Sequence, residues 1–347
     1  MSLFLDALAK KPTPRTPVWL MRQAGRYQPS YRAIREKVGF MELCKDPGLC
    51  AEVALRAVDD LGVDAAIVFS DILVVLEPLG IGFEFTKGEG PSIASPLRSA
   101  ADVARVKTEI DAAGTLSYVM DAIRETKRSL GGRVPLIGFA GAPFTLASYV
   151  IEGGGSREYA ETKKLMRTDE GAWHALMEKI SDALVRYVSS QIDAGIDAFQ
   201  LFDSWVGALG PRDYQRFVLP HSRRVLASIA GRVPSIHFAT GNPALIPQLA
   251  RAGGDVIGLD HRAPLAASWE LVPEHGVQGN LDPTTLLGPE EAMRNEAGAI
   301  LEEAAGRPGH VFNLGHGVLP SVKLAQARAL VDFVHEESER LRAAERA

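Results

Sequence analysis

Short apolar runs alternate with helical patterns along the whole chain, and this alternation limits the folds open to it. Eight runs have the length and composition of buried β-strands, and each is followed by polar residues or glycine. They are Pro17–Met21, Ala65–Ser70, Pro135–Ala140, Ala198–Asp203, Pro234–Ala239, Asp255–Leu259, Gly276–Asn280 and His310–Leu314. Because strands joined through helices pair in parallel, the pattern predicts an α/β protein with helices outside a parallel sheet.

The segments between these runs carry helical signals. Asp46–Asp60 begins with an Asp-Pro pair, which suits the N-cap and the first helical position. Gly171–Ala194, Pro211–Ala230 and Pro320–Arg342 place apolar residues at helical spacing. The long connection from 71 to 134 contains EPLGIGFEF and KGEGPSIAS, which predict an additional hairpin before the next helix.

Eight strand–helix units in 347 residues favour a (β/α)₈ TIM barrel, with residues 1–347 forming a single catalytic domain. A doubly wound sheet is the alternative, but it needs fewer strands and usually a glycine-rich turn after the first one. This chain has MRQAGRY at that place. Its triple glycine, in VIEGGGSRE, lacks the lysine of a P-loop, and we interpret it as a flexible connection or lid.

Charge and cysteine usage exclude several classes of partner. The net charge is −5, whereas nucleic acids and acidic membranes select basic surfaces. No apolar run approaches the length of a membrane span, and MSLFLDALAKK lacks the basic start of a signal peptide. Cys44 and Cys50 are the only cysteines, too few for a disulfide framework or a structural zinc site. We therefore expect a cytoplasmic protein that binds a small molecule.

The first strand runs directly into two arginines, in the stretch VWLMRQAGRY. Arg22 and Arg26 are four residues apart, with Gly25 between them. A guanidinium stays charged at any working pH, and burying one without a partner is very costly. These arginines therefore point into water, or a negative ligand meets them. Arginine suits bidentate recognition of carboxylates and phosphates.

Polar residues also follow the other strands, where the active site of a parallel barrel lies. They are Ser70, Asp71, Tyr149, Asp203, Ser204, Thr240, Asn242, Asp260, Asn280 and His316. Together with the arginines they predict a pocket with a positive rim, a central carboxylate at Asp71, hydroxyls and an imidazole. Ser204 does not lie in a GxSxG elbow, and the chain has no HExxH motif or Cys/His cluster.

Each of these residues also has a purely structural interpretation. Asp71 and Asp203 are equally well placed to be N-caps of the next helix. His316 lies between two glycines and suits a turn, while Tyr149 suits the core. The functional interpretation depends on all of them converging at one rim.

Several long motifs resemble the uroporphyrinogen decarboxylase family. They are VWLMRQAGRY followed by QPSYR, IVFSDILVV, GFAGAPFTLASYVIEGGGS, FQLFDSWVG and FNLGHGVLP. They span residues 17 to 320, nearly the whole chain. The resemblance implies a (β/α)₈ barrel that acts as a homodimer in haem biosynthesis, without cofactor or metal. The implied reaction removes the four acetate carboxyls of uroporphyrinogen III and leaves coproporphyrinogen III and CO₂.

The resemblance also assigns roles, and the chain matches the family pattern at each of these positions. The catalytic residues of the family correspond to Asp71, Arg22 and Arg26 of this chain. Its substrate-binding residues fall on Arg22, Gln23, Ala24, Gly25, Arg26, Asp71, Tyr149, Ser204 and His316.

Two other functions compete with this one. Zinc- and corrinoid-dependent methyltransferases share the barrel, but that family has a His-x-Cys pattern of zinc ligands near the fifth strand. The matching stretch of this chain is His237-Phe-Ala239, which lacks the cysteine thiolate. A non-catalytic tetrapyrrole carrier is the second alternative, although a carrier has no need for a carboxylate beneath the pyrrole nitrogens.

Overall fold

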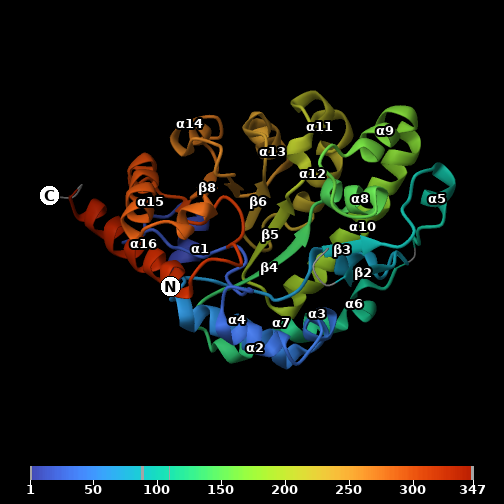
Figure 1. Cartoon of the computed structure of the whole chain (residues 1–347). Coiled ribbons are helices and arrows are strands. Elements are labelled where there is room, and N and C mark those ends of the chain that lie inside the picture. Colours follow the sequence, from blue (N-terminus) through green and yellow to red (C-terminus); the bar gives the residue numbers. More distant parts are fainter. Residues whose placement is uncertain (1, 87–89, 109, 345–347) are drawn as a thin grey trace.

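Seven parallel strands form one sheet in the computed structural model, which describes residues 2–86, 90–108 and 110–344 (Figure 1). Each strand pairs with the next strand of the sheet along the chain, so the order is β1-β4-β5-β6-β7-β8-β9. The strands are β1 Ala66–Ile67, β4 Leu136–Gly141, β5 Ala198–Asp203, β6 Ser235–Ala239, β7 Val256–Gly258, β8 Gly276–Gln278 and β9 His310–Val311. Because all neighbours are parallel, their carboxyl ends meet at one edge, as the sequence predicts.

Side-chain hydrogen bonds across the inner face show that this sheet is curled. β5 and β8 are three strands apart, which is about 14 Å in a flat sheet. Nevertheless Gln278 Nε2 donates to Gln200 Oε1 at 3.0 Å, and Gln278 Oε1 accepts from Trp19 Nε1 at 2.9 Å. All three side chains are buried. The inner face therefore encloses a narrow interior, and the segment that carries Trp19 lies inside the same enclosure.

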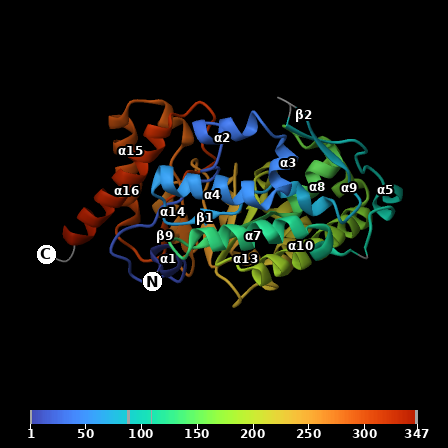
Figure 2. The same ribbon diagram turned by 90° about the horizontal axis from the view of Figure 1, so that it is seen from below.

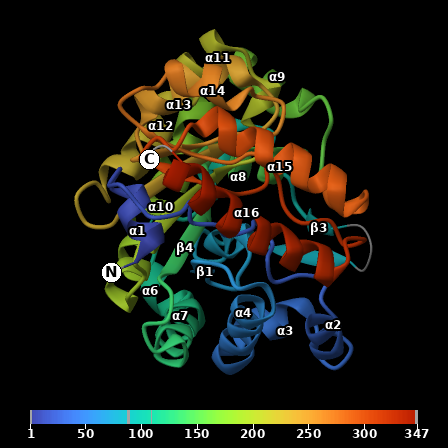
Figure 3. The same ribbon diagram turned by 90° about the vertical axis from the view of Figure 1, so that its left-hand side faces the viewer.

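Helices cover the outer face and meet around it (Figures 1 and 2). α4 packs against α7, α7 against α10, and α10 against α12, while α16 packs against both α15 and α4 (Figure 3). These helices are α4 Pro47–Leu61, α7 Ser117–Leu130, α10 Glu170–Ala194, α12 Leu219–Ala227, α15 Glu290–Ala304 and α16 Leu324–Ala344. The other α-helices are α1 Leu3–Leu8, α2 Pro29–Arg35, α3 Phe40–Lys45, α5 Ala100–Ala104, α6 Ala112–Thr115, α8 Pro143–Glu152, α9 Ala160–Thr168, α11 Pro211–Phe217, α13 Ile246–Ala252 and α14 Leu265–Glu270. Short 3₁₀ helices are η1 Ile72–Leu76, η2 Val206–Ala208, η3 Pro243–Leu245 and η4 Pro283–Leu287.

The expected first strand, Pro17–Met21, is the main difference from the predicted strands. Only Val18 forms a parallel bridge, to Phe312 just after β9. On its other side the carbonyl of Val18 accepts from the amide of Asp64 at 2.8 Å, just before β1. The Val18 amide itself donates to Asp64 Oδ2 at 2.8 Å, so a carboxylate replaces the next ladder bond. The segment thus bonds to both edges of the sheet without forming a regular strand.

Two predicted helices also differ, for local reasons. Pro211–Ala230 is divided at Val218 into α11 and α12, because Pro220 has no amide hydrogen to continue the first helix. The last helix begins at Leu324 rather than at Pro320. The N-cap of α4 is as predicted, since the Asp46 side chain accepts from Leu49 N.

The predicted hairpin is confirmed as β2 Phe83–Thr86 paired with β3 Gly90–Ile93. Its connecting residues 87–89 lie outside the described residues. β3 is attached to the end of α8, because the Ile93 amide donates to the Gly153 carbonyl at 2.9 Å. Gly153 ends α8 in the left-handed conformation, with φ 89°. The triple glycine therefore begins as a helix C-cap that anchors the hairpin.

The described helices were also compared with the requirements of a membrane span. None of these helices is both long enough and apolar enough to cross a bilayer.

Replacing Asp64 with alanine tests how much the closure of the sheet depends on one carboxylate. Asp64 Oδ2 also accepts from His335 Nε2 on α16 at 2.7 Å, and Oδ1 accepts from Arg15 Nη2 at 3.3 Å, so the variant leaves three donors without their partner. We expect the free energy of unfolding to fall by about 2–3 kcal/mol in urea titrations. Asp121→Ala, which removes an exposed partner of Arg124, is the control and should change it by less than about 0.5 kcal/mol. Equal losses in the two variants would contradict the anchoring role.

Candidate active site

The loop after the first segment is built around the buried side chain of Gln23. Gln23 Oε1 accepts from the Leu20 amide at 3.2 Å, and Nε2 donates to the Ala65 carbonyl at 3.1 Å. The Tyr27 hydroxyl donates to the Gln23 carbonyl at 2.6 Å. Arg22 takes a left-handed conformation, with φ 60°. The chain therefore turns sharply away from the core, and Gln23 holds the turn while its neighbours face outward.

The side chains of Arg22 and Arg26, the two arginines of this loop, are both exposed. Among the described residues, neither guanidinium forms a hydrogen bond or an ion pair. The Arg22 side chain lies over Gly317, where an added Cβ would stand only 2.4 Å from Arg22 Cδ. Glycine in the GHG sequence thus leaves room for Arg22 to reach the neighbouring loop. Arg26 lies further out, close enough to Tyr31 of α2 to influence its pKa.

The loop residues between the two arginines also include Ala24 and Gly25, which have no polar side chain. Ala24 and Gly25 have intermediate exposure. The Gly25 amide donates to Gln28 Oε1 at 3.2 Å, and an added Cβ at Gly25 would lie 3.0 Å from the Arg22 carbonyl oxygen. These two residues therefore shape the turn without supplying a polar side chain.

Asp71 is an N-cap, the structural role that the sequence left open, and one of its two oxygens remains without a hydrogen bond. It is the N-cap of η1, and its Oδ1 accepts from the Leu73 amide at 2.8 Å. In the part of the chain that the structure describes, Oδ2 accepts no hydrogen bond. Burial raises the pKa of Asp71 to about 6, against the lowering effects of the Leu73 amide and of Arg22. One oxygen is thus used by the fold, and the other is available to a ligand.

Tyr149 on α8 belongs to the same group. Its ring stacks on Trp205, with centroids 3.7 Å apart and planes at 28°. Burial and the nearby carboxylate of Asp71 raise the pKa of Tyr149 to about 12, and Arg22 opposes them. The phenol is therefore protonated at neutral pH and can donate a hydrogen bond. Trp205 was missed by the sequence analysis, although it directly follows Ser204 in LFDSWVG.

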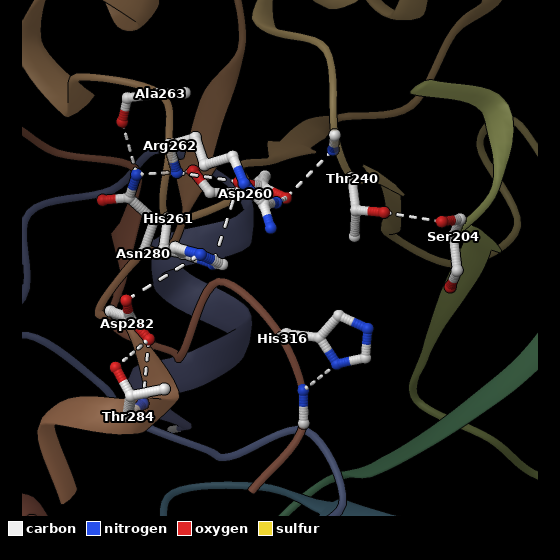
Figure 4. A network of polar contacts seen from close by, with 12 residues as sticks. Ser204, Thr240, Asp260, His261, Arg262, Ala263, Asn280, Asp282, Thr284 and His316 are labelled. Atoms are coloured by element: carbon white, nitrogen blue, oxygen red, sulfur yellow. Dashed lines mark hydrogen bonds and ion pairs between the residues drawn. The ribbon is translucent and has the colours of Figure 1, made fainter. Parts of the chain in front are cut away.

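At the end of β5, Asp203 is buried and the next residue, Ser204, has intermediate exposure. Thr240 Oγ1 donates to the Ser204 carbonyl at 2.5 Å, as Figure 4 shows. Asp203 is fully buried; its Oδ1 accepts from Thr145 Oγ1 of α8 at 2.9 Å. Burial raises the pKa of Asp203 to about 7. Asp203 is not the N-cap that its position suggested, because it links β5 to α8 instead.

His316 presents one defined nitrogen to the site. The Gly317 amide donates to His316 Nδ1 at 2.7 Å, so the proton of the neutral ring resides on Nε2. Loss of solvent around the ring and the charge of Arg22 lower the pKa of His316, while Asp260 opposes them. The imidazole is therefore neutral at neutral pH, and Nε2 is a hydrogen-bond donor.

A second polar network lies at the ends of β7 and β8 (Figure 4). Asn280 Nδ2 donates to the carbonyls of Asp260 and Ala263, at 2.9 and 2.6 Å. Asp260 is buried, and its Oδ2 accepts from the Gly241 amide at 2.9 Å. His261 Nε2 lies 3.9 Å from Asp282 Oδ2. This network joins the loops after three neighbouring strands and gives the rim a rigid side.

Asn242, predicted at a strand end, and His237, which lies within β6 at the position of the methyltransferase ligand pattern, both bond to the fold. Asn242 caps η3, and its Nδ2 donates to the Leu209 carbonyl at 2.9 Å. His237 is fully buried, with Nδ1 3.3 Å from the Leu249 carbonyl of α13, so it faces a helix rather than the rim. Within the described ranges, no three His, Cys, Asp or Glu side chains are grouped so as to hold a metal ion.

Arg22 is the residue that connects the predicted site. Its charge acts on Asp71, Tyr149 and His316, which come from three different parts of the sequence. The fold and these residues define an α/β protein whose rim combines unpaired positive charge with one available carboxylate oxygen. Such an arrangement can bind a ligand that is acidic at its edge and carries donors or positive charge at its centre.

Comparison with known proteins identifies the family. The family model described as "Uroporphyrinogen decarboxylase (URO-D)" matches residues 1–337. Uroporphyrinogen decarboxylase of Carboxydothermus hydrogenoformans is 52% identical over 337 residues, which are 96% of each chain. That of Koribacter versatilis is 48% identical over 344 residues, 98% of this chain and 97% of its own. The chain belongs to the uroporphyrinogen decarboxylase family.

Solved structures show the same fold in proteins of other activity. A methyltransferase from Methanosarcina mazei superimposes with a TM-score of 0.80 at 21% identity, covering 96% of this chain and 97% of its own. A B12-independent methionine synthase from Shewanella sp. superimposes with a TM-score of 0.60 at 12% identity, covering 95% and 96%. At such identities these likenesses establish the fold alone.

Proposed function

We propose that this protein is a uroporphyrinogen decarboxylase, which converts uroporphyrinogen III to coproporphyrinogen III and four CO₂. Its relatives of that name are 48–52% identical over nearly their whole length. The observation that carries the proposal is the unpaired guanidinium of Arg22 beside the available Oδ2 of Asp71. Without a ligand, the charge of Arg22 has no partner in the described chain. The substrate, a ring of four pyrroles bearing eight carboxylates, supplies such a partner.

The substrate fits the geometry in two places. Arg22 and Arg26 bind carboxylates at the edge of the macrocycle, in the bidentate manner that a guanidinium allows. Asp71 Oδ2 accepts from the pyrrole N–H groups, which converge when the flexible porphyrinogen domes. Tyr149, Ser204 and the Nε2–H of His316 donate to the substrate, and the loop Gln23, Ala24 and Gly25 forms the surface beside it.

The reaction needs an electron sink, and the pyrrole itself provides one. Protonation of a pyrrole carbon makes the ring cationic. The bond between the acetate methylene and its carboxylate then breaks, its electron pair enters the ring, and CO₂ leaves. Protonation of the methylene carbon gives the methyl group, and the ring loses the proton that it gained. Each acetate thus consumes one proton and releases one CO₂.

Asp71 stabilises this cation because its negative charge already lies beneath the pyrrole nitrogens. Opposite unit charges about 4 Å apart attract by about 4 kcal/mol at an effective dielectric constant of about 20. An attraction that appears only after protonation lowers the barrier rather than strengthening the ground state, and it is worth about a thousandfold in rate.

The proposal includes the organisation of the protein. Residues 1–347 form one (β/α)₈ barrel, in which the segment Pro17–Met21 takes the place of the eighth strand. The bonds of Val18 to Phe312 and Asp64, on both edges of the sheet, support this. The protein acts as a homodimer in the cytoplasm, and it uses neither a cofactor nor a metal.

Anaerobic incubation with uroporphyrinogen III tests the function directly. We expect four CO₂ per macrocycle and a product that retains four carboxyls, measured by chromatography after oxidation to the porphyrin. Tight binding with all eight carboxyls retained would instead indicate a tetrapyrrole carrier. Corrinoid-dependent methyl transfer by protein that contains stoichiometric zinc would favour the methyltransferase alternative.

Replacing Asp71 with asparagine tests the role of its charge. We expect kcat to fall by about a thousandfold, because the amide cannot stabilise the cation. In the wild type, kcat/KM should fall about tenfold per pH unit below about pH 6, where Asp71 becomes protonated. His316→Asn is the control and should keep this acid limb. An acid limb with the same midpoint in Asp71→Asn would show that another group titrates.

A further inference from the structure

Arg262 is an exposed arginine whose position is set by a buried carboxylate. Its Nη1 donates to Asp260 Oδ2 at 2.7 Å, and its own backbone amide donates to Asp260 Oδ1 at 2.7 Å. The two side chains are 59% and 4% exposed. Asp260 is held in turn by the Gly241 amide. Both oxygens of the carboxylate are thus used to fix one guanidinium and the loop that carries it.

This pair differs from the ion pairs on the helices of the protein. Arg294 and Glu290, for example, pair along one helix between two half-exposed side chains. Such pairs hold neither partner firmly. At Arg262 the acceptor is immobile, and the Nε and Nη2 groups donate no hydrogen bond to any described residue. The guanidinium therefore presents free donors in a preset orientation, which is the arrangement that favours binding of a carboxylate.

The position of Arg262 relates it to the candidate site. In Figure 4, hydrogen bonds join Arg262 to Asp260, Asp260 to the Gly241 amide and Thr240 to the Ser204 carbonyl, and His316 is drawn beside this network. Arg22 and Arg262 both lower the pKa of His316, after the larger effect of lost solvent. Only Arg22 of the two influences Asp71. The charge of Arg262 therefore acts on the imidazole of His316, whereas the pKa of Asp71 responds to Arg22.

We propose that Arg262 is a further substrate-binding residue, which holds a carboxylate of the macrocycle remote from the reacting pyrrole, and that Asp260 is its positioning residue. This inference rests on the proposed function and extends it to the loop after β7. An octa-acid substrate needs cations on more than one side if its ring is to be centred over Asp71. Because the carboxylate that Arg262 holds does not react, its binding is equal in the ground and transition states, so it acts on KM and not on kcat.

Arg262→Gln, with Arg294→Gln as matched control, tests this. We expect KM for uroporphyrinogen to rise about tenfold in Arg262→Gln with kcat within about twofold, and both constants unchanged in the control. The dissociation constant of uroporphyrin, the oxidised octa-acid that is not decarboxylated, should rise in parallel when measured by fluorescence titration. The KM of Arg262→Lys should lie between those of the wild type and Arg262→Gln, because lysine keeps the positive charge but cannot form the bidentate contact of a guanidinium.

Asp260→Asn distinguishes positioning from a structural role. We expect it to raise KM as Arg262→Gln does, and the double variant to add nothing further, because Asp260→Asn acts only through the guanidinium that Arg262→Gln removes. Additive effects, or a loss of kcat together with a lower Tm, would contradict the positioning role of Asp260.

The outcomes separate this inference from the proposed function. Normal KM and normal uroporphyrin affinity in Arg262→Gln would overturn the inference while wild-type CO₂ release upholds the function. If the wild type releases no CO₂ but Arg262→Gln weakens uroporphyrin binding, the function fails and the carboxylate site stands.

Discussion

Arg22 and Asp71 come from two neighbouring strand ends and influence each other without forming an ion pair, and the candidate site depends on this relation. A direct pair would satisfy both charges and leave nothing for a ligand. Instead, one oxygen of Asp71 is held by the Leu73 amide, and Arg22 lies over Gly317 on the neighbouring loop. The positive and the negative charge thus form no direct ion pair, and both remain available to an amphoteric ligand.

Keeping charges unpaired costs stability, and buried polar side chains offset this cost by fixing the loops that carry them. Gln23 holds the first loop, Asp203 joins β5 to α8, and Asn280 ties the loop after β7 to β8. Each of these side chains bonds mainly to neighbouring backbone or hydroxyl groups rather than to the rim. The rim residues are therefore preorganised, and binding needs to spend little energy on ordering them.

Local patterns were sufficient to predict most of the elements. Apolar runs between polar ends located seven strands, and the Asp-Pro pair located the start of α4. The sequence did not reveal that Pro17–Met21 forms a single bridge instead of a regular strand. The reason is that the Val18 amide bonds to a side chain from elsewhere in the sequence, that of Asp64. The break in the predicted helix Pro211–Ala230 had a visible cause in Pro220, which the apolar periodicity concealed.

The site was predictable as a set of strand-end residues but not in the direction of each side chain. Asp71 and Asp203 look alike in sequence, each following an apolar run, yet one caps a helix at the rim and the other is buried. Trp205 lies within the motif FQLFDSWVG and Arg262 lies in none of the quoted motifs, and their relation to Tyr149 and His316 emerges only when distant segments meet. Sequence spacing identifies which residues share an edge, whereas packing decides which of them face a ligand.

The central claim is that a fixed carboxylate stabilises a macrocycle that serves as its own electron sink. A crystal structure of the protein with coproporphyrinogen, prepared anaerobically, tests it most directly through the distances from Asp71 Oδ2 to the pyrrole nitrogens. The claim predicts hydrogen-bond distances of about 3 Å, with Arg22 on a carboxylate at the edge of the ring. A complex in which Asp71 turns away from those nitrogens while Arg22 and Arg26 face bulk solvent would contradict it.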